Sequence, residues 1–228
     1  MAINYTLNTS FTEQDLGRFF ATGSNVVVAK PSSSGGSPDV AWVVFHPLLN
    51  NTMTWTEDYG IYASTAELVN GALLTQISRS DFPAVDGKIY PFTPAGYFGP
   101  PEAGGLPGSF YTVNLYKNDL GYLTFGLFQD AIVNNKPAAG NAISAASVLY
   151  KSKAQMTPFT TIYLWIQSQV QSNSVVTLVT SPMTKVTFGG STTSISLAYD
   201  SDTGEFIRAA NTELAEGITL DHFIPSLI

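Results

Sequence analysis

The sequence predicts an all-β fold: an antiparallel β-sandwich, or flattened barrel, of about ten strands with one short N-terminal helix. Three observations support this prediction. Apolar and polar residues alternate with a period of two over most of the chain, clusters rich in Gly and Pro separate the alternating runs, and helical patterns are few and short. Strands at such short spacing, with almost no helix between them, favour a sandwich or barrel over βαβ units.

The helix is expected in the stretch SFTEQDLGRFFATG, residues 10–23. Thr12 is a suitable cap, and Glu13 and Asp15 suit the first helical turn. Gly23 is expected to end the helix after about two turns. Three apolar residues at helical spacing are expected to share the face that packs on the core: Leu16, Phe19 and Phe20.

The run DVAWVVFHPL, residues 39–48, is apolar on both faces. Such a run is typical of a strand that is buried on two sides, and Trp42 within it is interpreted as a core residue. The runs FYTVNLYKND and GYLTFGLFQD, residues 110–119 and 121–130, alternate apolar with polar residues instead. They predict two half-exposed strands.

The last third of the chain continues the alternation. In TTIYLWIQSQV, residues 160–170, the aliphatic residues share one face. The opposite face carries aromatic rings and amides: Tyr163, Trp165, Gln167 and Gln169. Residues 185–207 predict three short strands, with one turn at Gly189 and another in the Asp-Ser-Asp-Thr-Gly segment that begins at Asp200.

We expect a single domain over residues 1–228. The best candidate for a sub-boundary is the stretch rich in Gly and Pro at residues 94–109. Because Tyr97, Phe98 and Leu106 can anchor this stretch, one long surface loop is favoured over a linker.

The composition excludes several classes of function. Without cysteine the chain forms no disulfides or thiolate metal sites, and two histidines, His46 and His222, are too few for a multi-histidine zinc centre. Ten basic against seventeen acidic residues give a net charge of −7, so no phosphate-neutralising surface for nucleic acid is expected. No cofactor is expected either.

The chain shows neither a signal-peptide pattern nor an apolar run long enough to form a transmembrane segment. We therefore expect a soluble protein without a signal peptide, either cytoplasmic or released by a non-classical route. Charged residues make up only 12% of the chain, so neutral polar side chains are expected to supply most of its hydrophilic surface.

The segment TWTEDYGIYAS, residues 54–64, holds two adjacent acids, Glu57 and Asp58. Adjacent residues of a strand point to opposite faces, so the two carboxylates are not expected to act as a pair. A glycoside hydrolase needs a second acid from another strand, and Asp130, Asp200 and Glu205 are the candidates.

Two other patterns are weaker indications of a catalytic or metal-binding site. His46 can serve as a base, but no G-x-S-x-G elbow accompanies it. Asp200 and Asp202 resemble the opening of a calcium loop, yet they lack the downstream Glu and the flanking helices of an EF-hand. A tight hairpin with Gly204 at positive φ is the favoured interpretation of these aspartates.

The strand pattern also predicts aromatic faces suited to a sugar. Flat rings offer surfaces on which sugar C–H groups stack, and carboxylates or amides satisfy the hydroxyls. The ligand-binding residues predicted in this way are Trp55, Glu57, Tyr59, Tyr163, Trp165 and Gln167. With its acidic, hydroxyl-rich and cysteine-free composition, the chain is similar in type to soluble lectins.

We therefore expect a non-catalytic protein that binds a neutral glycan or another small polar ligand. A pore-forming or membrane-docking β-protein and a carboxylate- or His-based enzyme are the alternatives, and a homo-oligomer joined through sheet edges is left open. The same aromatic residues can instead fill the core. The burial of Glu57 distinguishes these interpretations, because a lone carboxylate is seldom left in an apolar core.

Overall fold

The computed structural model describes residues 3–209 and the backbone of residues 221–223. Within these residues the chain forms one helix and eighteen strands in three sheets, so the prediction of an all-β fold is confirmed. The strands outnumber the prediction because turns and bulges divide the chain into many short ones.

The largest sheet has nine strands, which in chain order are β1 (Asn4–Ser10), β4 (Asn50–Thr56), β5 (Gly60–Ser64), β6 (Gln76–Arg79), β10 (Tyr122–Val133), β11 (Lys136–Ala142), β12 (Ala146–Leu149), β16 (Ser194–Asp200) and β17 (Glu205–Arg208). Their order in space is β17-β16-β1-β4-β10-β5-β6, and β11 and β12 also pair with β10.

Strand β10 is the centre of this sheet. The strands β4 and β5 follow one another along one of its edges, and β11 and β12 pair along the other. Between β4 and β5 the chain leaves the ladder at residues 57–59. This bend lies opposite the part of β10 where a bulge between Gln129 and Ala131 interrupts the ladder to β11. The ladder is therefore irregular on both edges of β10 at the same level.

A five-stranded sheet has the order β18-β15-β14-β2-β3, and its strands are β2 (Ser24–Pro31), β3 (Pro38–Phe45), β14 (Thr161–Ser168), β15 (Met183–Thr187) and β18 (Asp221–Phe223). The third sheet, in the order β13-β9-β7-β8, contains β7 (Lys88–Phe92), β8 (Glu102–Ala103), β9 (Phe110–Asn114) and β13 (Lys153–Met156). The pairs β1–β16 and β7–β9 are parallel, and the other strand pairs of the described residues are antiparallel.

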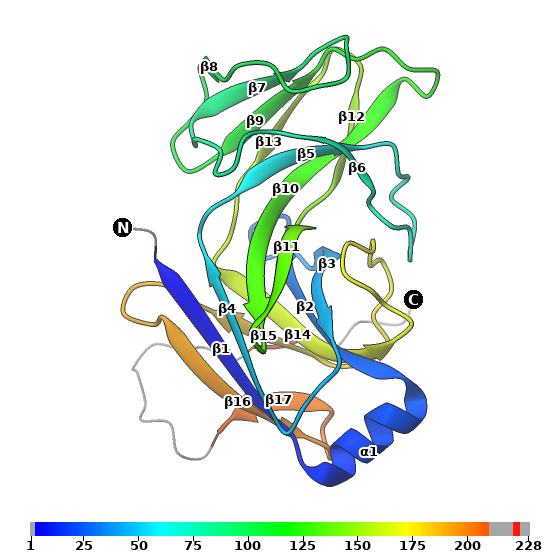
Figure 1. Cartoon of the computed structure of the whole chain (residues 1–228), viewed down its shortest axis with the longest axis vertical. Coiled ribbons are helices and arrows are strands. Elements are labelled where there is room, and N and C mark those ends of the chain that lie inside the picture. The colour runs from blue at the N-terminus through cyan, green and yellow to red at the C-terminus, as the bar shows by residue number, and fades with distance from the viewer. Residues whose placement is uncertain (1–2, 210–220, 224–228) are drawn as a thin grey trace.

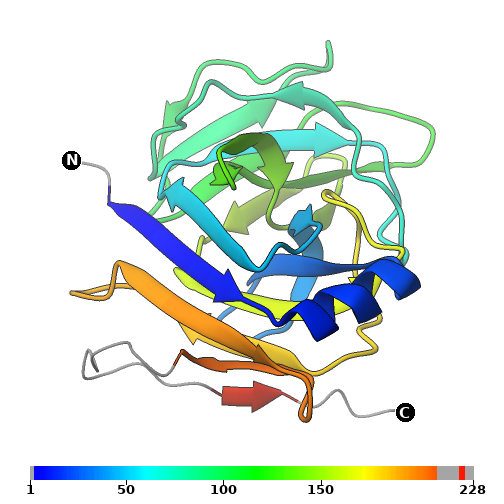
Figure 2. The same ribbon diagram turned by 60° about the horizontal axis from the view of Figure 1, so that its bottom comes forward.

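The sheets are arranged along one long axis. Figure 1 shows the four-stranded sheet at one end of that axis and the helix at the other. Figure 2 shows β1 and β16 side by side, with the helix following β1. The largest core cluster draws buried residues from all three sheets, including Val28, Ile61, Phe110 and Leu164. A single core thus joins the sheets, as in a sandwich-like fold.

The sequence prediction of half-exposed strands is wrong for β9 and β10. Thr112 and Asn114 of β9 are fully buried, and each donates a hydrogen bond to a backbone carbonyl, of Tyr90 and Val148 respectively. All residues of β10 from 123 to 129 are buried as well. Strands flanked on both edges and covered on both faces bury polar side chains, provided that these find partners.

The helix α1 (Glu13–Thr22) is formed as predicted. Thr12 caps it, its side chain and that of Asp15 form a capping box, and Gly23 ends it with a φ of 64°. The prediction of one apolar face is wrong at its last member, because Phe19 is 7% exposed whereas Phe20 is 78% exposed. The ring of Phe20 instead lies beside that of His46, with centroids 6.5 Å apart.

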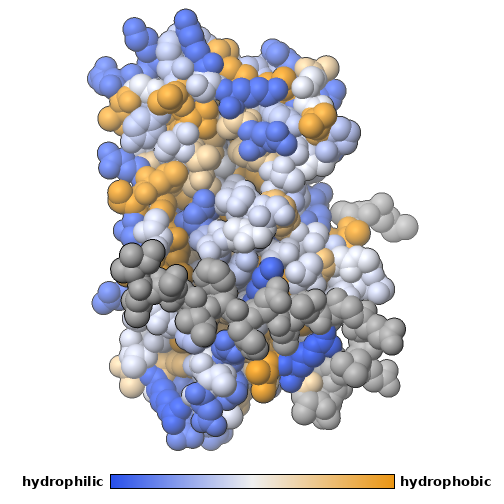
Figure 3. Space-filling view, turned by 180° about the vertical axis from the view of Figure 1, so that it is seen from behind, coloured by the Kyte–Doolittle hydropathy of each residue, from blue (hydrophilic) through white to orange (hydrophobic). Residues whose placement is uncertain are grey.

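The stretch at residues 94–109 connects β7 to β9 and contains β8. Phe98 anchors it, because its ring centroid lies 5.0 Å from that of Phe92. Tyr97 and Leu106, the other expected anchors, are exposed. Seen from behind, residues of intermediate hydropathy cover much of the surface, with apolar and strongly hydrophilic residues interspersed (Figure 3). This face fits the composition, in which neutral polar residues outnumber charges.

Candidate functional site

Lys30 is the most unusual residue of the core. It lies on β2 with its side chain 1% exposed. Its ammonium lies 5.1 Å from the ring centroid of Trp42, 5.2 Å from that of Tyr59 and 6.0 Å from that of Trp55. Burial lowers the pKa of Lys30 to about 8, although the nearby charge of Glu57 acts in the opposite direction. An ammonium group in such surroundings requires a counter-charge.

Glu57 supplies that counter-charge. Its Oε1 accepts hydrogen bonds from the Lys30 ammonium at 3.3 Å and from the Trp55 indole N–H at 3.1 Å. Its Oε2 accepts a hydrogen bond from the hydroxyl of Tyr59. Burial raises the pKa of Tyr59, and the negative charge of Glu57 raises it further, so the phenol remains a donor. Trp55, Glu57 and Tyr59 therefore meet as predicted, but through these hydrogen bonds and not through strand alternation, because β4 ends at Thr56.

The carboxylate of Glu57 also borders a pocket of about 240 Å³. Its side chain keeps 21% of its surface exposed. The other residues that line the pocket are Asp58, Tyr59, Pro83, Ala84, Asp86, Gly108, Phe110 and Pro158. Glu57 thus stands at the boundary of the core, with three donors on its inner side and the pocket on the other.

Backbone contacts hold the pocket walls together. The N–H of Ala84 donates to the carbonyl of Tyr59 at 2.7 Å, which fixes the segment after β6 to the bend after β4. The N–H of Gly108 donates to Oδ2 of Asp86 at 2.6 Å, and the rings of Tyr59 and Phe110 lie 5.9 Å apart. Three segments distant in sequence therefore enclose the carboxylate of Glu57.

Asp58 differs from its predicted position. The alternation of a strand places Asp58 on the face opposite Glu57, but β4 ends at Thr56 and the chain bends at residues 57–59. Both side chains consequently line the same pocket, together with Asp86. Three carboxylates therefore surround a small space, and they accept hydrogen bonds from hydroxyl groups.

None of the acids named as partners of Glu57 lines this pocket. Asp130 sits in the β10 bulge, where its Oδ1 accepts from the N–H of Gly140 at 2.6 Å. Glu205 begins β17. Asp200 accepts from the N–H of Asp202 at 3.0 Å and from the Thr203 hydroxyl at 3.0 Å.

The carboxylate of Asp200 is thus engaged inside the β16–β17 hairpin, and these hydrogen bonds lower its pKa. Gly204 has a φ of 77°, as the predicted tight turn requires. Asp202 is exposed in the same turn. In the described residues, no group of three or more His, Asp and Glu side chains is placed to hold a metal ion.

The second predicted aromatic face lies elsewhere. Tyr163 and Trp165 are 3% and 0% exposed, and they pack in a cluster with Val27, Ala29 and Met183 on the face of β14 that points away from the main core. Gln167 is half-buried, and its Oε1 accepts from the Trp165 indole at 2.7 Å.

Gln167 lines a separate pocket of about 260 Å³ with polar neighbours that include Asn70, Gln169 and Ser174. The structure thus brings Trp55, Glu57 and Tyr59 together and separates them from Gln167. The two predicted faces do not combine into one site.

His46 is not among the residues that line the Glu57 pocket. His46 is exposed after β3, and no hydrogen bond or ion pair joins it to another residue of the described chain. The backbone of His222 belongs to β18, but its side chain lies outside the described residues.

Sequence reasoning missed Lys30, Asp86 and Gln129. Gln129 is fully buried beside the bend, and its Nε2 donates to the carbonyl of Thr56 at 2.5 Å. A lysine inside the apolar run NVVVAKP was a readable signal for a buried pair. Asp86 gave no comparable signal, because an Asp-Gly pair usually marks a turn.

In the described part of the chain, no helix is both long and apolar enough to cross a membrane. The chain was also compared with protein-family models, with curated proteins and with solved structures. No family model, no curated protein and no solved structure matches it.

Proposed function

We propose that the chain is a non-catalytic carbohydrate-binding protein whose Glu57 pocket holds one neutral sugar residue. One observation carries this proposal. Three donors hold the Glu57 carboxylate in one orientation, while a fifth of its side-chain surface stays exposed at the pocket. A group that is already ordered loses little conformational entropy when a ligand binds, so it is well suited to select hydroxyl groups.

The chemistry of the walls supports a neutral polyhydroxylated ligand. Carboxylates of Glu57, Asp58 and Asp86 accept hydrogen bonds but donate none. Pro83, which is exposed, and Pro158, which is half-buried, add apolar surface for the C–H groups of a sugar ring. The volume of about 240 Å³ is below the range of drug-sized pockets, roughly 300–1,000 Å³. The pocket therefore suits one ring, with the rest of a glycan outside.

Glycoside hydrolysis is the second candidate, because Glu57 shares its pocket with Asp58 and Asp86. Two carboxyl groups on either side of a glycosidic bond are what such enzymes use. Glu57 already accepts three hydrogen bonds, which suits an acceptor more than a proton donor, so binding without turnover is the first proposal. Incubation of the purified chain with each glycan that binds, followed by analysis of released reducing ends, separates the two.

A glycan array followed by isothermal titration calorimetry tests the proposal. We expect saturable binding of a neutral glycan, weakened about five- to tenfold in Asp86→Asn, because a charged acceptor contributes about 1 kcal/mol more than a neutral one. Glu102→Gln is the matched control, since it removes an exposed carboxylate of β8 that is not among the residues lining the pocket. A blank array, or equal binding by Asp86→Asn and wild type, contradicts the proposal.

The pore-forming or membrane-docking alternative stays a prediction. Release of an encapsulated dye from liposomes is its direct assay. Leakage together with a blank glycan array favours that alternative over the one proposed here.

A further inference from the structure

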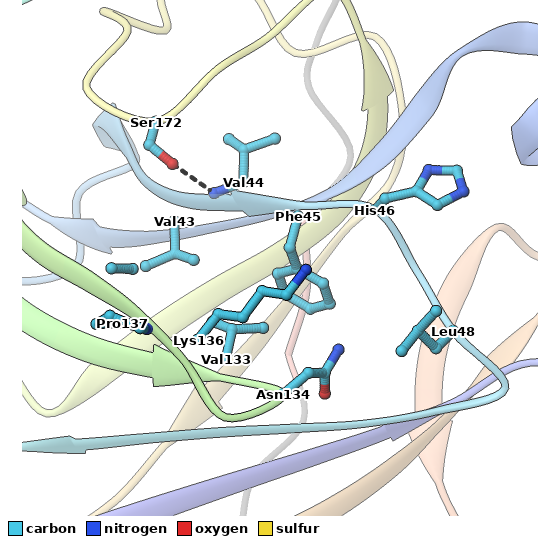
Figure 4. Close-up of a pocket in the computed structure, with 11 residues that line it drawn as sticks. Val43, Val44, Phe45, His46, Leu48, Val133, Asn134, Lys136, Pro137 and Ser172 are labelled. Carbon is cyan, nitrogen blue, oxygen red and sulfur yellow. Dashed lines mark hydrogen bonds between the residues drawn. The ribbon is translucent and has the colours of Figure 1, made fainter.

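A second and larger pocket lies between the end of β3 and the β10–β11 hairpin. It measures about 490 Å³ and shares no lining residue with the Glu57 pocket. Figure 4 shows side chains from both elements around it. Its lining residues are Val43, Val44, Phe45, His46, Leu48, Val133, Asn134, Lys136, Pro137, Ala138 and Ser172.

The walls of this pocket are mostly apolar, in contrast to those of the Glu57 pocket. Val43 and Phe45 of β3 face Val133 and Pro137 of the hairpin across the space (Figure 4). Leu48, 51% exposed, extends the apolar wall towards the surface. A volume of this size lies within the range that encloses a small organic ligand.

Two neutral polar side chains of the lining, Asn134 and Ser172, already have hydrogen-bond partners. Asn134 donates from Nδ2 to Oδ1 of Asn51 at 3.0 Å, and its Oδ1 accepts from the N–H of Thr52 at 2.9 Å. The hydroxyl oxygen of Ser172 accepts from the N–H of Val44 at 2.9 Å. Asn134 and Ser172 therefore help to fix the shape of the pocket, and the charged lining residue is the better candidate for binding a ligand's head group.

Lys136 is the charged residue available for that recognition. It is exposed, and in the described chain no hydrogen bond or ion pair occupies its ammonium. Figure 4 shows it extended across the space between the hairpin and β3, whereas the ring of His46 is turned outward. Among the residues that the structure describes, no Asp or Glu lines the pocket, although acids outnumber bases seventeen to ten in the whole chain.

From these contacts we infer that this cavity, the Lys136 pocket, binds a small amphipathic carboxylate. The apolar chain of the ligand lies between β3 and the hairpin, and its carboxylate pairs with the Lys136 ammonium. The ligand matches the pocket in charge as well as in shape, because the described lining residues include a cation and no anion. Burial of each methylene adds to the affinity, and the charged hydrogen bond selects the head group.

Decanoate, used below its micelle concentration, is the probe. Calorimetry is expected to show one saturable site, with octanoate about tenfold weaker because it lacks two methylenes. Decanol is expected to bind at least tenfold more weakly than decanoate, since it cannot pair with an ammonium. Shifts of the methyl signals of Leu48 and Val133 in NMR spectra locate the bound chain.

The variant Lys136→Met keeps an unbranched apolar side chain and removes the charge. It is expected to bind decanoate as weakly as wild type binds decanol, while Lys117→Met, an exposed lysine outside the pocket, leaves binding unchanged. Equal affinity for decanoate and decanol, an unaffected Lys136→Met variant, or binding to vesicles of anionic phospholipid without binding of decanoate overturns the inference. A sugar that fills the Glu57 pocket is expected not to compete with decanoate.

Discussion

Removal of the Glu57 charge is expected to destabilise the fold far more than removal of the Lys30 charge. The two partners differ in burial, since the side chain of Lys30 is 1% exposed and that of Glu57 is 21% exposed. In Glu57→Gln the ammonium stays in the core among three aromatic rings without a carboxylate. In Lys30→Met the carboxylate keeps its hydrogen bonds from Trp55 and Tyr59 and its exposure at the pocket.

The expected magnitudes follow from this asymmetry. A buried charge left without its partner costs about 3–5 kcal/mol, which is the loss expected for Glu57→Gln. Lys30→Met fills a similar volume and removes a desolvated charge, so its free energy of unfolding is expected to stay within about 1 kcal/mol of wild type or to rise. The double variant is expected to resemble Lys30→Met, which gives a coupling energy of about 3–5 kcal/mol, equal to the loss in Glu57→Gln.

Urea unfolding followed by tryptophan fluorescence measures these free energies. Asp58→Asn is the control for a nearby acid, because no hydrogen bond or ion pair joins Asp58 to another described residue, and we expect a change within about 0.5 kcal/mol. A loss in Lys30→Met as large as that in Glu57→Gln refutes the reasoning. Such a result would mean that Glu57 needs the Lys30 ammonium as much as Lys30 needs the carboxylate.

Two further predictions concern stability. The free energy of unfolding is expected to rise by roughly 1 kcal/mol per pH unit between about pH 8 and 10, because the pKa of Lys30 is about 8 in the fold and 10.5 without it, so the unfolded chain binds the extra proton. Above that window the free energy of unfolding is expected to fall with pH, because Tyr59, whose pKa is raised in the fold, keeps its proton there and loses it in the unfolded chain. Unfolding curves of wild type and Lys30→Met at several pH values measure the contribution of Lys30. Equal slopes of the two proteins below pH 10 contradict the prediction. Gly126→Ala is expected to cost at least about 2 kcal/mol, because its Cβ would overlap the carbonyl oxygen of Ser144 and lie 2.7 Å from the Tyr62 ring. Gly17→Ala, in a helical position with open space around it, is the matched control and is expected to stabilise by about 0.5–1 kcal/mol in the same assay.

Local patterns predicted local structure well. The capping box of Thr12 and Asp15 and the turn at Gly204 formed as expected, because each depends on residues a few positions apart. The exposure of β9 and β10 was not predictable in the same way. Alternation reports the polarity of a strand's two faces, but only the packing of the folded chain shows that other elements cover both faces, as the core clusters on either side of β10 do.

The candidate site, too, depends on contacts that local sequence patterns do not predict. The spacing of Trp55, Glu57 and Tyr59 predicted that they meet, but the bend at residues 57–59 that brings Asp58 to the same pocket was not predictable from it. Lys30 lies 27 positions from Glu57, and its approach depends on β2 of one sheet facing β4 of another. Asp86 reaches the pocket only because the segment after β6 is bonded to the bend at Tyr59. Contacts of this kind arise from topology, which a single sequence does not encode locally.

The sequence predicted that Trp55 offers its ring to a sugar, but in the structure this ring is buried. Trp55 is 3% exposed, so its ring contributes little surface for stacking. Its indole N–H instead helps to fix Glu57, and its ring forms part of the cage around Lys30. Under the proposed function, Trp55 acts on a ligand only through the carboxylate that it holds. On this view Trp55→Phe, which keeps a large ring but loses the N–H, weakens ligand binding by loosening Glu57.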